Sequence, residues 1–283
     1  MSSFLFVTHL TPFKKRSKLR SALQKIYFKA LQNQTYNNWK VLLIGEEEKK
    51  NRNFHEVSIG NYNSDYELSE RLADIYERPE IINLFEEADF IIKLDDDDLI
   101  SPTILSKVKD LDFDVYYDLY HVFYDVTSGK ISRQKRNWLA STCIHKREHA
   151  CAKIHKIASD NIYRNSLLYS DHSLHWHSYY ADKNGVAAGE THPIYLRILS
   201  PSSISSNLGN SNLNFKNPTD FFEYDNYLKS FGTWENYNIS EFDNYKNELA
   251  TAWQMYTGNS LRQLNLHGSF ELFLQFLKSK ILK

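Results

Sequence analysis

Four consecutive aspartates, Asp95 to Asp98, follow directly on a short aliphatic and aromatic run at residues 90–94. Such a run is typical of a strand that is buried in a sheet. Ser101 and Pro102 then predict a helix start, with serine as the N-cap and proline at the first helical position. We therefore expect the carboxylates where a central strand ends and a helix begins, which is where open α/β sheets place their ligand crevice.

The four carboxylates, called the acidic turn below, predict a cation site. Side chains alternate along an extended chain, so Asp95 and Asp97 are expected on one side and Asp96 and Asp98 on the other. Two carboxylates on one side suit a hard divalent cation, which prefers oxygen ligands. The alternative is a merely solvated turn. An EF-hand loop does not fit, because glycine and glutamate are missing from its sixth and twelfth positions.

The composition limits the classes of function. The chain has 283 residues, enough for one large domain with or without an extension. Its 34 basic and 35 acidic residues nearly balance, which argues against a nucleic-acid partner. Two cysteines eight positions apart match no zinc pattern and favour a reducing compartment. The N-terminal apolar run is too short for a signal peptide, and no run could span a membrane, so we expect a cytoplasmic protein.

The first part of the chain predicts alternating strands and helices. Strands are expected at residues 4–8, 39–44, 54–59 and 90–94, and helices at residues 19–31, 67–76 and 79–87. Strand, helix and strand in succession make a βαβ unit. This region therefore predicts a nucleotide-binding-like half-domain with the acidic turn near its end.

The rest of the chain is less regular. Strands are expected at residues 114–126, 131–136, 139–145 and 193–199, with a hairpin turn at 127–130 and a helix following Asp171. A serine- and asparagine-rich loop at 201–217 precedes two helices, one ending near Gly258 and one starting at Ser269. We expect a domain at residues 1–200 and, at 201–283, a flexible loop with a helical extension.

Two phrases in the chain resemble those of a known family. Residues 34–39 read QTYNNW, and residues 94–98 read LDDDD with Pro102 four positions on. In this order, on these predicted elements, they resemble the family 2 glycosyltransferases of the GT-A fold, over residues 4 to 200. The resemblance implies an α/β, Rossmann-like mixed sheet flanked by helices, with a C-terminal helical extension.

The resemblance also implies an activity and its residues. Such enzymes transfer a sugar from a nucleotide-diphosphate sugar, such as a UDP-sugar, to an acceptor hydroxyl; here it implies an inverting, metal-dependent hexosyltransferase-type enzyme of bacterial surface polysaccharide or glycan biosynthesis. The implied site residues are the Mg²⁺ or Mn²⁺ ligands Asp95 and Asp97, the donor contacts Thr8, Glu46, Arg71, Asp95 and Asp96, and the general base Asp171. Glu46 stands where the family has an aspartate pair, and Arg71 only echoes the family's A-R-N phrase.

Several interpretations stay open at this point. The basic residues Arg133, Lys135, Arg136, Lys146 and Arg147 form either a solvated surface or a site for an anionic acceptor or diphosphate. The helix from Ser269 packs on the domain, forms a homodimer, or lies on anionic lipid at the inner face of the cell membrane, where lipid-linked glycan acceptors reside. The rival functions are a nucleotidyltransferase, which would need a glycine-rich loop after the first strand, and a non-catalytic glycan- or cation-binding protein on a GT-A scaffold.

Overall fold

The computed structural model describes residues 1–13, 16–47, 49–50, 52–136, 139–140, 142–154, 166, 168, 173–190, 192–201, 224 and 226–257. Its strands are β1 (Phe4–His9), β2 (Trp39–Gly45), β3 (Lys49–Lys50), β4 (Phe54–Ser58), β5 (Phe90–Lys93), β6 (Leu99–Ile100), β7 (Val115–Asp118), β8 (Tyr120–Asp125), β9 (Ile131–Lys135), β10 (Ile144–Lys146), β11 (Gly185–Ala188) and β12 (Tyr195–Leu199). Its helices are α1 (Lys18–Gln32), α2 (Asp65–Tyr76), α3 (Pro79–Glu86), α4 (Ile104–Val108), α5 (Arg147–Ala150), α7 (Ser173–Tyr179), the 3₁₀ turn η3 (Ser240–Phe242) and α9 (Asp243–Thr257).

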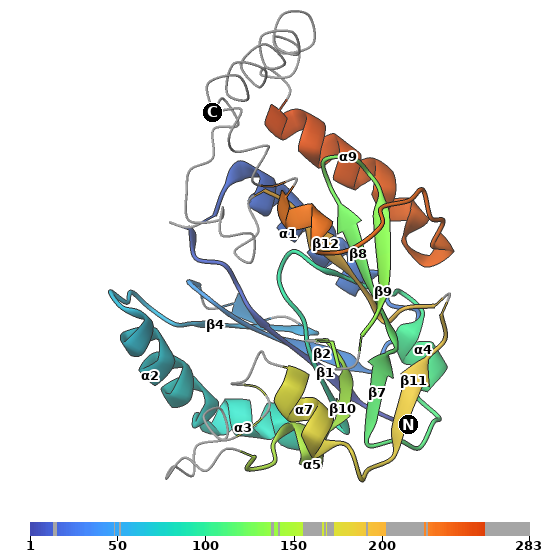
Figure 1. Cartoon of the computed structure of the whole chain (residues 1–283). Helices are drawn as coiled ribbons and strands as arrows, with labels where there is room; N and C mark the ends of the chain where they lie inside the picture. Colours follow the sequence, from blue (N-terminus) through green and yellow to red (C-terminus); the bar gives the residue numbers. More distant parts are fainter. Residues whose placement is uncertain are drawn as a thin grey trace, which may run out of the picture.

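The strands form two sheets, one with the order β11-β7-β10-β5-β1-β2-β4-β3 and one with the order β6-β12-β8-β9. The first is mixed, because β4, β2, β1 and β5 run parallel while β10 runs antiparallel to β5. Helices α1 and α9 cover one face of this sheet, and α2, α3, α5 and α7 lie on the other (Figure 1). The predicted α/β class, with a mixed sheet flanked by helices, is confirmed.

Strand β1 shows why this sequence makes a central strand. Phe4 and Phe6 pack in the core under α1, whereas Leu5 and Val7 pack in the core under α2 and α3. A strand that is apolar at every position is buried on both faces, as parallel strands usually are. In the sheet, β1 has β2 as its neighbour on one side and β5 on the other. The direction in which successive strands are added to the sheet therefore changes at β1. In parallel sheets, a ligand crevice forms at the carboxyl ends of such strands.

Three predicted elements differ in the structure. The strand expected at 114–126 is two strands, β7 and β8, which belong to different sheets. The break between β7 and β8 follows Asp118. Its buried carboxylate accepts a hydrogen bond from the Ile194 amide (2.8 Å), which joins the end of β7 to the segment before β12. The helix expected after Ser101 and Pro102 begins only at Ile104, because the Ser101 hydroxyl donates to Glu241 (2.6 Å) rather than capping the helix. The strand expected at 139–145 is the shorter β10.

Helix α9 packs on α1. Tyr245 and Leu249 are buried in the core that also contains Phe4 and Phe6 of β1. The Asn33 amide donates to the Tyr245 hydroxyl (2.9 Å). The predicted loop from 202 onward and the predicted helix from Ser269 lie outside the described residues, and the division of the chain at residue 200 stays a prediction. Within the described part of the chain, no helix is long and apolar enough to cross a membrane.

Candidate functional site

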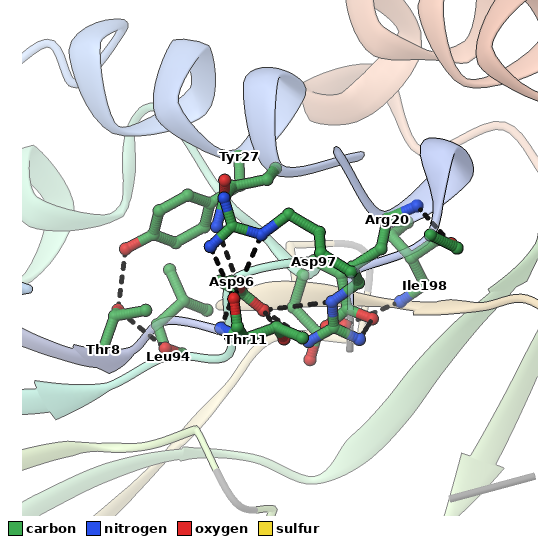
Figure 2. A network of polar contacts seen from close by, with 12 residues as sticks. Thr8, Thr11, Arg20, Tyr27, Leu94, Asp96, Asp97 and Ile198 are labelled. Carbon is green, nitrogen blue, oxygen red and sulfur yellow. Dashed lines mark hydrogen bonds and ion pairs between the residues drawn. The ribbon is translucent and has the colours of Figure 1, made fainter. Parts of the chain in front are cut away.

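The acidic turn follows β5 at the carboxyl edge of the parallel strands. The Leu94 amide still donates to the Val7 carbonyl of β1 (3.1 Å), and the chain then turns, with the Asp98 amide donating to the Asp95 carbonyl (3.2 Å). Strand β6 follows at once and pairs with β12. The acidic turn therefore lies among β1, the start of α1 and β12, as predicted for a strand end that faces a ligand crevice (Figure 2).

The expected alternation of the four carboxylates is wrong. Asp95 is exposed, whereas Asp96, Asp97 and Asp98 are buried. Asp96 and Asp97 both contact Arg20 of α1, so they do not point to opposite sides. The physical reason is that the backbone turns at these residues, and strict alternation holds only for an extended chain.

The Asp96 side chain connects the acidic turn to the loop after β1 and to the start of α1. It accepts hydrogen bonds from the Thr11 amide (2.8 Å), the Thr11 hydroxyl (3.0 Å), the Gln24 amide (2.8 Å) and Arg20 Nε (3.1 Å). Helix α1 begins here because the Ser17 side chain caps it, accepting from the Arg20 backbone amide (3.0 Å). Asp96 was predicted to contact the donor, but its side chain is fully buried and turned toward the protein.

Asp97 and Asp98 are held by different partners. Asp97 forms an ion pair with Arg20, and Asp98 accepts the Ile198 amide of β12 (2.8 Å). Burial raises the pKa of Asp97, although Arg20 opposes the shift. Burial and the adjacent Asp97 raise the pKa of Asp98. The charged forms of Asp97 and Asp98 are therefore costly in this place, because water screens them little.

Two further arginines interact electrostatically, Arg197 with the acidic turn and Arg136 with Arg197. Burial opposes the charge of Arg197 of β12, but Tyr195, Asp98 and Asp95 together raise its pKa. Burial and the charge of Arg197 lower the pKa of Arg136, which follows β9 and lies over the Phe123 ring (5.6 Å to the centroid). Positive charges attract anions, and arginine suits phosphate oxygens because its planar fork can make two hydrogen bonds.

The side chains present do not fit the predicted divalent cation well. Of its two predicted ligands, Asp95 is exposed and Asp97 is paired with Arg20. Among the described residues, the acidic turn does not bring three carboxylate oxygens together within the distance that a shared ion requires. A guanidinium that carries a permanent charge at Asp97 would also repel a metal ion there. The requirement for Mg²⁺ or Mn²⁺ therefore stays an untested prediction.

Thr8 and Glu46 lie near the acidic turn but serve the protein's own packing. The Thr8 hydroxyl is buried and bonded to the Tyr27 hydroxyl and the Leu94 carbonyl (both 2.7 Å), which joins β1, α1 and the end of β5. The carboxylate of Glu46, after β2, accepts the Phe13 amide (3.0 Å). Glu46 thus orders the loop after β1.

Arg71 and Asp171 are not brought to the acidic turn by any described contact. Arg71 lies on α2, where it pairs with Glu67 (2.8 Å) and donates to the Ile59 carbonyl (3.2 Å) beside the end of β4. Strands β1 and β2 separate β4 from β5. Asp171 lies outside the described residues, two positions before α7 begins at Ser173. Its assignment as general base stays a prediction.

The two phrases that carry the family resemblance contact each other. The Gln34 side chain donates to the Ser101 carbonyl (2.9 Å), and the Thr35 amide donates to the Pro102 carbonyl (2.9 Å). The turn after α1 therefore supports the segment that leaves the acidic turn. These two phrases act together because each satisfies backbone groups of the other.

The predicted basic cluster is divided. Arg133 pairs with Glu190 (2.9 Å), Lys146 lies close to Glu148 (3.2 Å), and Arg147 donates to a carbonyl at the end of α3 (3.1 Å). Of these residues, Arg136 is the one whose charge is close to that of Arg197. Whether Lys135, Arg136 or another of these residues binds an anion stays a prediction.

The sequence did not point to Arg20, Gln24 or Arg197. A signal for the first two was present, because Arg20 and Gln24 stand four positions apart among the apolar residues Leu19 and Leu23. Polar side chains on the buried face of a helix need partners, so they indicate a buried polar contact. Arg197 alternates with apolar neighbours in β12 and looks in sequence like any half-exposed strand residue.

The comparisons with known proteins give weak similarities. No protein-family profile matches the chain, and no curated protein does. Among solved structures, TarS of S. aureus aligns at 10% identity over 94% of this chain and 75% of its own, with a TM-score of 0.41. The glycosyltransferase GlyE of Streptococcus pneumoniae aligns at 8% identity over 81% and 64%, with 0.33. The galactosyltransferase LgtC, solved with donor and acceptor sugar analogues, aligns at 9% identity over 87% and 99%, with 0.36. Scores this low do not assign an activity, which has to rest on the geometry of the site.

Proposed function

We propose that this chain is a glycosyltransferase that moves a sugar from a nucleotide-diphosphate sugar to an acceptor hydroxyl. One observation carries the proposal: the acidic turn lies at the carboxyl end of β5 beside β1, the strand at which the strand order changes direction. Arg20 contacts this turn, and Arg197 interacts electrostatically with it. Nucleotides bind at this place in open α/β sheets. The phrase at residues 34–39 supports the same interpretation, because Gln34 and Thr35 hydrogen-bond to Ser101 and Pro102, which directly follow the acidic turn.

Arg136 and Arg197 would bind the diphosphate of the donor. Arg197 lowers the pKa of Arg136, and a bound anion would favour the charged form of both guanidinium groups. A positive group at the diphosphate also stabilises the charge that develops on the leaving group when the sugar is transferred. Asp95 is exposed, and its charge contributes to the raised pKa of Arg197.

The finer parts of the proposal concern the acceptor. Asp171, just before α7, would take the proton of the acceptor hydroxyl, and in-line attack would invert the anomeric carbon. The acceptor would be a glycan or a lipid-linked glycan of bacterial surface polysaccharide assembly. The protein would act in the cytoplasm, with the C-terminal segment attaching it to the inner face of the membrane or joining two copies.

A thermal-shift screen of nucleotide sugars tests the proposal, because a bound donor raises the apparent stability by mass action. We expect one nucleoside diphosphate and its sugar to stabilise the wild type. Arg197→Gln should weaken binding by about 10- to 100-fold, the usual effect of losing charge-assisted hydrogen bonds.

Arg133→Gln is the matched control, since it removes the same charge from a side chain that pairs with Glu190. If no nucleotide stabilises the wild type, or if both variants weaken binding equally, the proposal fails. A nucleotide that binds without any sugar transfer to acceptors would favour a non-catalytic binding protein.

A further inference from the structure

We propose that Arg20 is the resident cation of the acidic turn and takes the place of a divalent metal ion at Asp96 and Asp97. The guanidinium spans the two carboxylates: Nε and Nη2 donate to Asp96, and Nη1 donates to Asp97. A single side chain thus bridges the acidic groups that a metal ion would otherwise bridge. The inference rests on the proposed function only in its consequence for donor binding.

The bridge is built into the fold. The Arg20 side chain is 9% exposed, and its partners Asp96 and Asp97 are 0% and 8% exposed. Arg20 lies in the first turn of α1, whose start is capped by Ser17 and whose next turn places Gln24 on Asp96. Moving Arg20 away would leave two buried carboxylates without their counter-ion, which is strongly unfavourable.

A metal ion cannot share this position easily. Arginine stays protonated at all accessible pH values, so it cannot vacate the turn by losing its proton. A divalent cation near Asp97 would then face a fixed positive charge at short range. Of the other carboxylates, Asp98 accepts a hydrogen bond from the Ile198 amide and Asp96 is surrounded by Thr11, Gln24 and Arg20. The exposed Asp95 is left as a single ligand, which holds a divalent cation only weakly.

Charge balance points the same way. The four aspartates of the turn are faced by Arg20 from α1 and by Arg197 from β12, with Arg136 close to Arg197. The turn is therefore faced by Arg20 and, from the side of β12, by the charge of Arg197. A diphosphate could bind beside Arg197 without a metal ion to separate it from the carboxylates.

Titration with Mn²⁺ alone tests the inference, because it needs neither donor nor acceptor. Calorimetry and the electron paramagnetic resonance signal of free Mn²⁺ would be followed for the wild type, Asp97→Asn, Arg20→Gln and the double variant. We expect the wild type to bind Mn²⁺ no more tightly than about 1 mM, the weak end of protein cation sites. Arg20→Gln should bind at least ~10-fold more tightly, since the repulsion is gone, and adding Asp97→Asn should remove the gain.

The matched control is Arg16→Gln. Arg16 also lies at the start of α1, but its guanidinium donates to the Thr11 carbonyl and stacks on Phe13 instead of contacting the aspartates. This variant changes the net charge equally and should leave Mn²⁺ binding as in the wild type. Arg20→Lys keeps the charge but cannot span both carboxylates, so it should fall between the wild type and Arg20→Gln.

Two results would overturn the inference. One is micromolar Mn²⁺ binding by the wild type that disappears in Asp97→Asn, a result that needs no Arg20 variant to fold. The other is an Arg20→Gln protein, folded by circular dichroism, that binds Mn²⁺ no better than the wild type does. Binding of nucleoside diphosphate with and without a chelator is measured separately: the inference predicts equal affinity, whereas no binding in either case would count against the proposed function alone.

Discussion

Two clusters of acidic side chains lie at opposite ends of the strands of the eight-stranded sheet. They differ in burial and in the positive charges that face them. The acidic turn follows β5, while Asp114 precedes β7 and forms an exposed cluster with Lys146, Glu148 and His149. Strands β5 and β7 both run antiparallel to β10, so the end of one and the start of the other lie at opposite edges.

The exposed cluster has the better metal geometry but the weaker electrostatics. Asp114, Glu148 and His149 each place one ligand atom within 4.8 Å of the others, yet the Lys146 ammonium lies 3.2 Å from Glu148. Glu148 is 61% exposed, so water and salt screen these charges. The comparison shows that a group of carboxylates becomes a strong electrostatic site through burial and a fixed arginine, not through number or spacing.

The largest difference between the clusters should appear in stability. Asp96→Ala should reduce the free energy of unfolding by about 3–5 kcal/mol, because it leaves Arg20 buried with one partner fewer. Glu148→Ala, in the exposed cluster, should cost less than about 1 kcal/mol. Urea denaturation of both variants measures this, with Asp96→Asn as an intermediate that keeps the shape and loses the charge. Similar losses for the two alanine variants would contradict the comparison.

The clusters should differ next in their effect on turnover. Asp171→Asn should lower sugar transfer by at least ~10²-fold, the usual size of a general-base effect, with donor binding almost unchanged. Glu148→Gln should leave turnover near that of the wild type, since it lies at the opposite edge of the sheet. Initial rates and donor affinity are measured for each variant. If Glu148→Gln is the slower enzyme, the base belongs to the exposed cluster and the comparison is reversed.

A smaller effect should appear in the pH dependence of stability. Burial raises the pKa of Asp118 to about 8, although the Ile194 amide opposes the shift. The folded protein therefore keeps this proton to higher pH than the unfolded chain does, with its pKa near 3.9. Stability should fall as the pH rises from about 4 to about 8, and Asp118→Asn should flatten that decline.

Asp114, four positions earlier, should behave in the opposite way. Burial alone would raise its pKa, but the Asn184 amide and His149 lower it. Its contribution to stability is therefore present above the ordinary pKa of aspartate and is lost in acid. Melting temperatures of Asp114→Asn and Asp118→Asn, followed from about pH 2 to about pH 8, check both signs. Parallel curves for the two variants would show that the assigned environments are wrong.

Local patterns in the sequence predicted the helices and strands better than they predicted the contacts between distant residues. The strand before Asp95 and the helix α1 were found because their signals lie within a few neighbouring residues. The partners Arg20 and Arg197 stand far from the acidic turn in sequence, so no local pattern pairs them with it. The side chains of Asp96 and Asp97 also do not alternate as expected for an extended chain. Asp96 is held by contacts with Thr11 and Gln24, which lie far from it in sequence.

The strand expected at 114–126 was missed for a related reason. Its loose alternation continues across Asp118, but the chain changes sheets there because the Asp118 carboxylate binds the Ile194 amide. A contact made 76 positions along the chain decides where the strand ends. The sheet to which a strand belongs is thus a tertiary property that periodicity does not carry.

Hydrogen exchange with and without nucleoside diphosphate tests most directly whether the buried cluster, and not the exposed one, forms the donor site. Bound ligand slows exchange in the backbone that it contacts or orders. We predict slower exchange in peptides spanning residues 94–101 and 194–199, and no change in peptides spanning 112–118 and 144–150. Slower exchange in the second pair without the first would contradict the account.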